Sequence, residues 1–417
     1  MNKENKTKNI AFSPPEIGVD EINAVSEVLK SGWITTGSKT KLFEKKIADY
    51  CGTRESVCMN SATSCLELAL RLLGIGKGDE VITSAYTYSS SCSVICHVGA
   101  KPVLVDTQND SFEMDYEMAE SRINKNTKAI IPVDLGGVLC DYSRIFLAVN
   151  SKKHLFNAKN KLQEKLGRAA VIADSAHSFG AKKAFKNRSE NFSDKFMENS
   201  DIYLKKSGSI ADFTAFSFHA VKNLTTGEGG ALTWTIEDKD IYENLSVLSL
   251  HGQSKDAFAK LSPGCWEYDI LVPGYKCNMT DISAAIGLVQ FDKFESFLKK
   301  RGEIIEIYNR TLDREKVEIF QNSERAKYSS KHLYMLRLIG KKEEFRNRLI
   351  EKLAENEIAA NVHYKPLPMF TAYKNLGFNI ERFPNAFRMY ENEITLPLHT
   401  KMSVDDVFYI SKIFNNF

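Results

Sequence analysis

Short apolar runs rich in β-branched residues alternate with amphipathic stretches through the first two-thirds of the 417-residue chain. A run of about four to eight such residues suits a buried strand and is too short for a typical helix. In chain order we expect strands at ESVCMN, DEVITSA, KPVLVD, KAIIPVD, AAVIAD, FTAFSF and ALTWTI. Strand and helix in repeating order predict an α/β fold, with a mainly parallel mixed sheet flanked by helices.

A helix is predicted between the first two of these strands, in SCLELALRLLG. Its apolar side chains, Leu66, Ala69, Leu70 and Leu73, recur at helical spacing. Gly74 follows the last of them, and a glycine in this place typically ends a helix.

The chain is long enough to predict two domains. From about Thr280 the pattern becomes one long helix, which is followed by mixed strands and helices. We therefore expect a large domain over 12–279, including the N-terminal segment, and a smaller C-terminal α/β domain over 280–417. Two polar stretches interrupt the large domain: 140–170 holds a charged helical run, NAKNKLQEKLG, and 182–209 is loop-like.

Composition excludes several classes of function. The formal net charge is +3, from 56 basic and 53 acidic residues, and the absence of a basic tract argues against nucleic-acid binding. The polar start lacks the apolar core of a signal peptide, and no apolar run is long enough to cross a membrane. The eight cysteines form no C-x-x-C pair and the histidines lack metal-ligand spacing, so we expect no metal. These features predict a cytoplasmic protein.

Two charged residues stand where expected strands end, which is where open parallel sheets bind ligands. Asp174 ends AAVIAD, where a partly desolvated carboxylate would seek a cation; a helix N-cap explains it equally well. Lys222 lies between FTAFSF and the glycines of TTGEGG. In a dry pocket a lysine can lose its proton and form a Schiff base with an aldehyde, whereas a solvated lysine before a hairpin is the simpler alternative.

Two further segments suit a phosphorylated aromatic ligand. Ser61, Ala62, Thr63 and Ser64 stand where the helix begins, and the free N–H groups of a helix start bind phosphate; Ser and Thr there can also be simple caps. Tyr88 lies just past the strand DEVIT, where it could stack on a flat ring or pack in the core.

Together and in this order, the motifs resemble the sugar aminotransferases of the DegT/StrS type. They are NSATSCLELAL, GDEVITSAYTYSSS, GAKPVLVD, VIADSAHSFGA, FSFHAVKNLTTGEGG and PGYKCNMTDISAAIG. The resemblance extends from about residue 12 to 412. It implies fold type I enzymes that use pyridoxal phosphate (PLP).

The resemblance also implies roles for residues around the cofactor. Lys222 would bind the aldehyde of PLP covalently. Asp174 would pair with the pyridine nitrogen and keep it protonated, so that the ring can accept electrons. His177 would lie near the phenolic oxygen, and Tyr88 would stack on the ring.

The remaining roles concern the phosphate and the substrate. The phosphate would be held by Ala62, Thr63 and Ser217. Asn278 would reach the phosphate of a neighbouring subunit, because these enzymes build each active site across a homodimer interface. His363 and Tyr364 would approach the sugar.

The activity implied is transfer of an amino group, with L-glutamate as the usual donor and a keto nucleotide sugar as acceptor. The product would be an amino sugar for a surface polysaccharide or a secondary metabolite. Relatives that dehydrate sugars carry histidine in place of Lys222, so transamination is favoured. The freed lysine amine would act as general base, and the kinetics would be ping-pong.

Two alternatives stay open: a PLP aminotransferase of a cyclitol or another non-nucleotide ketone, and a non-catalytic regulatory relative. The chain also departs from the family pattern in three places. Asp134 stands where many members have histidine, the stretches 140–170 and 182–209 are longer than usual, and YKPLPMF lacks a histidine that often follows proline-leucine. These departures lie where the choice of sugar could be set.

Overall fold

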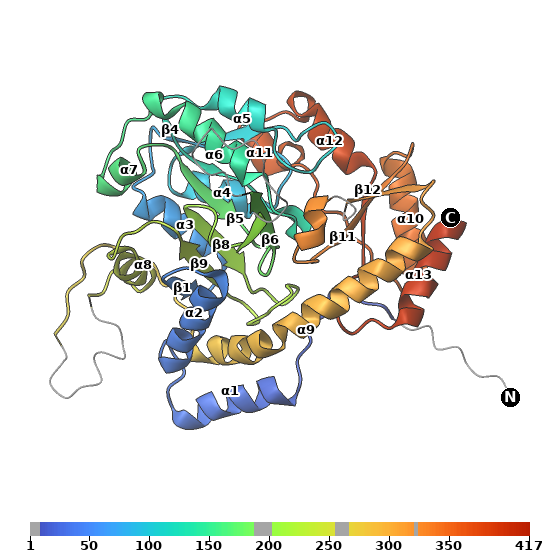
Figure 1. The fold of residues 1–417 in the computed structure, drawn as a ribbon, viewed down its shortest axis with the longest axis horizontal. Coiled ribbons are helices and arrows are strands. Elements are labelled where there is room, and N and C mark those ends of the chain that lie inside the picture. The colour runs from blue at the N-terminus through green and yellow to red at the C-terminus, as the bar shows by residue number, and fades with distance from the viewer. Residues whose placement is uncertain (1–8, 187–201, 255–266, 321–323) are drawn as a thin grey trace.

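The computed structural model describes residues 9–186, 202–254, 267–320 and 324–417 (Figure 1). Its centre is a seven-stranded sheet in the order β1-β9-β8-β5-β4-β2-β3. The strands are β1 (Ser56–Met59), β2 (Glu80–Ser84), β3 (Lys101–Val105), β4 (Thr127–Ile131), β5 (Ala170–Asp174), β8 (Phe213–Ser217) and β9 (Gly230–Trp234). β9 is antiparallel to both neighbours and all other pairs are parallel. All seven strands match the predicted apolar runs, with β4 and β9 each beginning one residue earlier, so the predicted fold class is confirmed.

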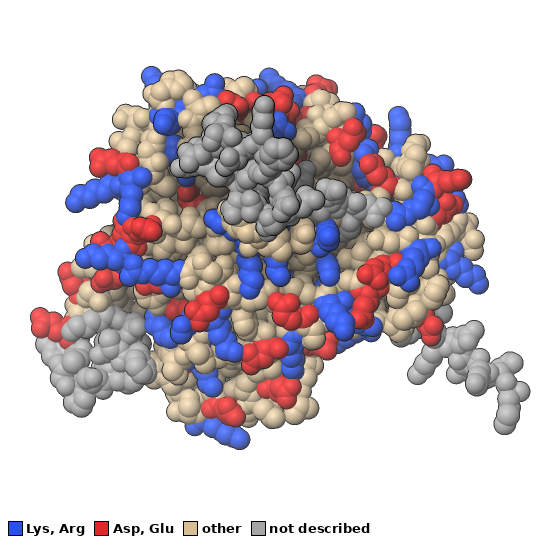
Figure 2. All heavy atoms as spheres, in the orientation of Figure 1, with Lys and Arg blue, Asp and Glu red and all other residues tan. Residues whose placement is uncertain are grey.

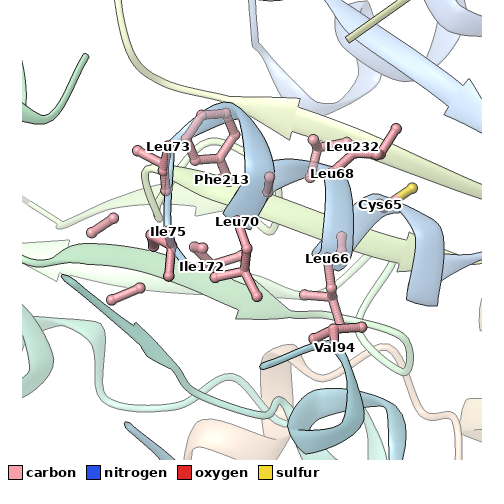
Figure 3. Close-up of a cluster of buried hydrophobic side chains, with 14 of the residues drawn as sticks. Cys65, Leu66, Leu68, Leu70, Leu73, Ile75, Val94, Ile172, Phe213 and Leu232 are labelled. Carbon is pink, nitrogen blue, oxygen red and sulfur yellow. The ribbon is translucent and has the colours of Figure 1, made fainter. Parts of the chain in front are cut away.

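The predicted helix is α3 (Ala62–Leu72), which packs on the sheet (Figure 3). Its side chains Leu66 and Leu70 are fully buried and join a core cluster that contains Ile172 of β5 and Phe213 of β8. Gly74 has φ +66°, a conformation that residues other than glycine rarely adopt, and the helix ends just before it.

Further helices of this part of the chain follow the strands. They are α4 (Ser90–His97), α5 (Tyr116–Arg122), α6 (Tyr142–Ser151), α7 (Lys161–Leu166) and α8 (Ile241–Ser249). The charged run expected in 140–170 forms α7, and Gly167 ends it in the left-handed conformation. Helices thus lie in the connections from β2 to β3, from β3 to β4 and from β4 to β5, whereas the described residues between β5 and β8 contain the strands β6 (Lys182–Lys186) and β7 (Ile202–Lys206).

Helix α9 (Asp281–Thr311) is the long helix expected after Thr280, whose side chain caps its first turn (Figure 1). It packs against α1 (Val19–Ser31), α2 (Ser38–Cys51) and α13 (Val404–Asn416). We propose that the division into two domains lies at its start, because the chain before it builds the large sheet.

The C-terminal part contains a three-stranded antiparallel sheet of β10 (Val317–Ile319), β11 (Tyr334–Leu338) and β12 (Glu393–Leu396). Its helices, besides α13, are α10 (Glu343–Glu355), α11 (Thr371–Asn375) and α12 (Pro384–Glu391). The ring of Tyr334 stacks on Tyr308 of α9 with a centroid separation of 4.6 Å, so this small sheet is built onto the long helix.

The loop-like prediction for 182–209 is wrong at both ends of the stretch. Residues Lys182–Lys186 and Ile202–Lys206 pair as the antiparallel strands β6 and β7. The rings of Phe185 and Tyr203 stack across this pair, so a cross-strand aromatic contact stabilises a segment that reads as polar. The central part of the stretch, 187–201, lies outside the described residues.

Charges of both signs are mixed over the face drawn in Figure 2, with no broad basic area. Among the described residues, none of the helices has the length and apolar content needed to cross a membrane.

Candidate active site

A cavity of about 630 Å³ lies where the strands of the large sheet end. Asp174 and Ser217 are the last residues of β5 and β8, and both line it. Its lining includes every site residue predicted from the sequence except Asn278, namely Ala62, Thr63, Tyr88, Asp174, His177, Ser217, Lys222, His363 and Tyr364. Segments from both halves of the chain therefore meet at one site.

Asp174 is almost fully buried, and its carboxylate accepts hydrogen bonds from Ser91 Oγ (2.6 Å) and from the amide of Ala176 (3.2 Å). Burial raises the pKa of this carboxyl, while the two hydrogen bonds and the charge of Lys222 oppose the rise. A turn follows the strand where a helix cap was one expectation. The carboxylate is thus held inside the cavity and does not cap a helix.

Lys222 lies in the loop that joins the antiparallel strands β8 and β9. The loop is closed by two backbone bonds, from Thr226 N to Phe218 O (2.9 Å) and from Phe218 N to Gly229 O (2.8 Å), and Gly227 turns it with φ +80°. The hairpin of the simpler alternative is present, yet the lysine side chain lines the cavity. Burial lowers the pKa of its ammonium to about 8, and the Asp174 charge limits this shift.

The start of α3 provides hydrogen-bond donors at one end of the cavity. Ser61 caps the helix, because its Oγ accepts from Ser64 N at 3.1 Å, so for this residue the capping interpretation is correct. The next residues, Ala62 and Thr63, have first-turn amides, which have no partner within a helix. Gly230 of β9 passes close by: a Cβ there would lie 2.5 Å from Ala62 N. Only a glycine lets this strand and helix approach so closely.

His177 is buried against groups from two other segments. Its Nδ1 accepts from the amide of Gly136 (3.2 Å), and its Nε2 lies 3.1 Å from the hydroxyl of Tyr364. The ring of His332 lies against it, with centroids 4.5 Å apart. Burial and the nearby Lys222 charge lower the pKa of His177 well below 6.5, so the ring is neutral.

His332 was not predicted from the sequence, although it lines the cavity and is only 4% exposed. Its Nδ1 lies 2.9 Å from Oδ1 of Asn223, the residue after Lys222, whose Nδ2 donates to Ser330 O at 2.6 Å. A histidine two residues before the apolar strand YMLRL is a weak signal in one sequence. Ser91, the partner of Asp174, is likewise not predicted, because one serine in a run of three carries no signal of its own.

The residues predicted near the substrate differ in their surroundings. His363 is buried, with Nδ1 3.0 Å from Thr395 Oγ1 and its ring stacked on Phe12 at 5.4 Å. Tyr364 contacts His177, as described above. Tyr88 is 62% exposed and its ring lies 5.8 Å from that of Tyr364, so it stands at the mouth of the cavity.

Asn278 is not brought together with the other site residues. It forms an isolated bridge with Met59 at the end of β1, and its Nδ2 donates to Thr36 Oγ1 at 2.5 Å. Lys276 also contacts its Oδ1. Asn278 does not line this cavity, so its role at the phosphate of a neighbouring subunit stays a prediction.

Asp134, one of the three departures, is fully buried. Its carboxylate accepts from the hydroxyls of Tyr142 (3.0 Å to each oxygen), Ser175 (2.6 Å) and Ser178 (3.0 Å) and from the amide of Cys140 (3.0 Å). Burial raises its pKa to about 6 despite these bonds. The side chain therefore holds the turn that carries His177 in place.

These residues fit pyridoxal phosphate. A buried carboxylate suits the ring nitrogen, a lysine of lowered pKa suits the aldehyde, and the α3 start next to Gly230 leaves backbone donors for the phosphate.

Comparison with known proteins agrees with this fit. The model of the DegT/DnrJ/EryC1/StrS aminotransferase family matches residues 15–415. SpsC, a spore coat polysaccharide biosynthesis protein of Bacillus subtilis, is 38% identical over 402 residues, which cover 95% of this chain and 94% of SpsC.

Two solved structures are similar over nearly their whole length. Spr1654 from Streptococcus pneumoniae, solved in the PMP form, is 50% identical and covers 98% of both chains with a TM-score of 0.89; it is also solved in the PLP form. PseC of Helicobacter pylori, an aminotransferase involved in the biosynthesis of pseudoaminic acid, is 28% identical. That match covers 98% of this chain and 100% of PseC, with a TM-score of 0.81.

Proposed function

Because this chain belongs to the DegT/DnrJ/EryC1/StrS aminotransferase family, we propose that it moves an amino group from L-glutamate to a keto nucleotide sugar. Its cofactor is pyridoxal phosphate. The observation that carries the proposal is the meeting of Lys222 and Asp174, which belong to different strand ends, in one cavity. The named roles of SpsC in polysaccharide biosynthesis and of PseC in pseudoaminic acid biosynthesis support a sugar as acceptor.

The cofactor would be held by residues that line the cavity. When bound, pyridoxal phosphate supplies an electron-withdrawing ring that stabilises negative charge beside the transferred nitrogen. Asp174 would keep the ring nitrogen protonated, and His177 would lie beside the phenolic oxygen. Tyr88 would cover the ring. The phosphate would be bound by Ala62, Thr63 and Ser217.

Lys222 would then act as the general base. A pKa of about 8 leaves part of its amine neutral near neutral pH, and a neutral amine can take the proton from the α-carbon of the amino donor. The same Nζ would return a proton in the second half of the reaction, at the carbon of the sugar that receives nitrogen. Because donor and acceptor use one cavity in turn, we expect parallel lines in initial-rate plots; intersecting lines would contradict this order.

We propose that the protein is a homodimer. Large apolar side chains of α1 and the segment before it are exposed, among them Ile17, Ile22 and Leu29. They line a hollow of about 430 Å³ together with Ala220 and Gly227, which flank Lys222 in the loop between β8 and β9. A contiguous apolar surface next to an active-site loop suits a subunit interface. Asn278 would then contribute to the cavity of the partner.

The test of function is a panel of ketosugars with L-glutamate as donor. UDP-, dTDP- and GDP-linked ketosugars are compared with free ketoses and a keto-cyclitol, and products are scored by mass and by NMR of the amino carbon. Turnover that is confined to nucleotide-linked sugars supports the proposal, whereas turnover of the keto-cyclitol favours an aminotransferase of a cyclitol or another non-nucleotide ketone. A protein with no visible absorbance band after addition of PLP would favour the non-catalytic alternative. A cytoplasmic location stays a prediction from the sequence.

A further inference from the structure

A chain of three groups, Gly136, His177 and Tyr364, leads from the backbone to the cavity. The amide of Gly136 donates to Nδ1 of His177 (3.2 Å), and Nε2 of the same ring lies 3.1 Å from the Tyr364 hydroxyl. A ring nitrogen that accepts a hydrogen bond carries no proton, so a neutral His177 has its proton on Nε2. The imidazole therefore donates to the Tyr364 oxygen.

The backbone and the ring of His177 are held in place by close contacts. The backbone of Gly137 approaches closely: a Cβ there would lie 2.9 Å from the carbonyl oxygen of His177 and 2.0 Å from Ser330 Oγ. The Ser330 hydroxyl donates to the same carbonyl oxygen, and the His332 ring covers the imidazole. Burial and the charge of Lys222 lower the pKa of His177 well below 6.5, so the ring does not gain a second proton near neutral pH.

The direction of this hydrogen bond determines where the Tyr364 hydroxyl can donate its own proton. Since the oxygen accepts from Nε2–H, the hydroxyl proton must be donated to another group. Within the described part of the chain, the hydroxyl has no second hydrogen-bond partner, and the nearby Asp174 is engaged with Ser91 and Ala176. Tyr364 lines the same cavity as Lys222, so its hydroxyl proton can be donated to a ligand bound there. Burial raises the pKa of Tyr364, which keeps the hydroxyl protonated.

We propose that Tyr364 is a positioning residue that donates a hydrogen bond to an acceptor oxygen of the bound ligand, with the direction of donation imposed by Gly136 through His177. This inference rests on the proposed function, because it assigns the group that orients the ligands of that same site. Two oxygens share the required chemistry, a carbonyl or hydroxyl oxygen of the sugar and the phenolic oxygen of the cofactor. A ligand group that can only donate, such as an ammonium, is disfavoured next to the Tyr364 hydroxyl, because this hydroxyl is itself a donor.

The first arm of the test uses cofactor-free protein with ¹⁵N-labelled histidine. Imidazole ¹⁵N–¹H correlation spectra, assigned with a His177→Gln variant, should show His177 neutral and protonated on Nε2. In Tyr364→Phe the proton of His177 should stay on Nε2, because the Gly136 amide still donates to Nδ1. The Nε2–H resonance should shift, because its acceptor oxygen is removed. A proton on Nδ1 would overturn the proposal. This arm needs neither sugar nor turnover, so it holds or fails independently of the proposed function.

The second arm compares Tyr364→Phe with Tyr334→Phe. Tyr334 is also a buried tyrosine with a bonded hydroxyl, to Asn309 Oδ1 at 2.8 Å, but it lies in the small sheet away from the cavity. Loss of one hydrogen bond to a ligand is expected to lower kcat/KM about tenfold in Tyr364→Phe and to leave Tyr334→Phe at the wild-type value. Circular dichroism and thermal melts show whether each variant is folded.

Two readouts separate the possible acceptors. A raised KM for the sugar with an unchanged pH midpoint of the visible band identifies a sugar oxygen. A shifted midpoint with an unchanged KM identifies the phenolic oxygen. If both quantities stay at their wild-type values in folded Tyr364→Phe, the hydroxyl donates to neither and the proposal is wrong. Should no sugar be turned over, the band midpoint decides whether the hydroxyl donates to the phenolic oxygen, and the Kd of the sugar, measured by titration of the visible band, takes the place of KM.

Discussion

Ser91 donates a 2.6 Å hydrogen bond to Asp174, which joins α4 to the last residue of β5 across 83 positions of sequence. The bond favours the ionised carboxylate and so opposes the rise in pKa that burial causes. Thr87 Oγ1 lies 2.8 Å from the same Ser91 hydroxyl. The charge that would pair with the cofactor ring therefore depends on a residue of the helix that follows β2.

The first prediction is that Ser91→Ala weakens cofactor binding about tenfold or more, because a hydrogen bond to a buried charged group contributes roughly 1.5–3 kcal/mol. Ser93→Ala is the matched control: Ser93 lies on the same helix, and among the described residues its hydroxyl bonds only the carbonyl of Ser90, at 3.5 Å. Absorbance titration of cofactor-free protein with pyridoxal phosphate measures both affinities. Equal affinities of the two variants would contradict the role assigned to Ser91.

The second prediction concerns the pH dependence of cofactor attachment. Only the neutral amine of Lys222 attacks an aldehyde, and burial lowers the pKa of this group to about 8. The rate of reaction of cofactor-free protein with pyridoxal phosphate should therefore rise with pH with a midpoint near 8 and level off about one to two pH units higher. Stopped-flow absorbance gives the rate, and Lys222→Ala supplies the background. A midpoint near 10.5, the value of an exposed lysine, would show that the cavity does not shift this pKa.

The third prediction concerns Gly230→Ala. The added Cβ would lie 2.5 Å from backbone atoms of Ser61 and Ala62, which cannot move away as a flexible side chain would. We expect a loss of roughly 1–3 kcal/mol in stability and weaker phosphate binding. Thermal melts without cofactor and titration with inorganic phosphate measure the two effects. In Gly76→Ala the new Cβ would lie 3.4 Å from Val98 O, so this variant should stay close to wild type; similar losses in both variants would rule out a specific close approach.

The fourth prediction concerns Glu393, a fully buried carboxyl that accepts from the amide of His363 at 2.8 Å. Burial raises its pKa from 4.5 to about 8. Between these values the folded protein keeps a proton that the unfolded chain has released, so the free energy of unfolding falls as pH rises through this window. Glu393→Gln should flatten this fall, by roughly 3 kcal/mol in total. Denaturant unfolding at pH 5 to 8 measures it, and the exposed Glu355→Gln should follow wild type.

The fifth prediction tests the shared site. When Lys222→Ala and Asn278→Ala subunits are mixed, each mixed dimer regains one cavity with both residues intact. Activity should rise above that of either variant, to about a quarter of wild type for random association. A mixture of Lys222→Ala with Asp174→Asn should stay inactive, because both residues line the cavity of one chain. Sedimentation velocity checks the oligomeric state; no gain with Asn278→Ala would place that residue outside the partner cavity.

Much of the fold follows from the chain itself. The seven apolar runs become the seven strands because such segments are stable only when both faces of a sheet are covered. The strand pattern also singled out Asp174 and the loop of Lys222 as candidate site residues, because ligands bind where parallel strands end. The family resemblance added the cofactor, which no single motif indicates.

Predictions from the local sequence pattern were wrong where contacts between side chains from different segments decide the structure. The pair of strands at 182–206 depends on contacts across the hairpin, such as Phe185 with Tyr203, which a polar composition conceals. The alternative that Asp174 caps a helix is wrong, because a turn follows β5.

The sequence by itself determined the strand order along the chain, the apolar core and the residue types of the site. Only the tertiary structure decided how the site residues are charged and oriented. Ser91 with Asp174, Asn223 with His332 and Tyr364 with His177 are separated by 83, 109 and 187 positions. The physical reason is that a pKa or a tautomer is set by the groups that burial brings within hydrogen-bonding distance, and such neighbours leave no periodic trace in one sequence.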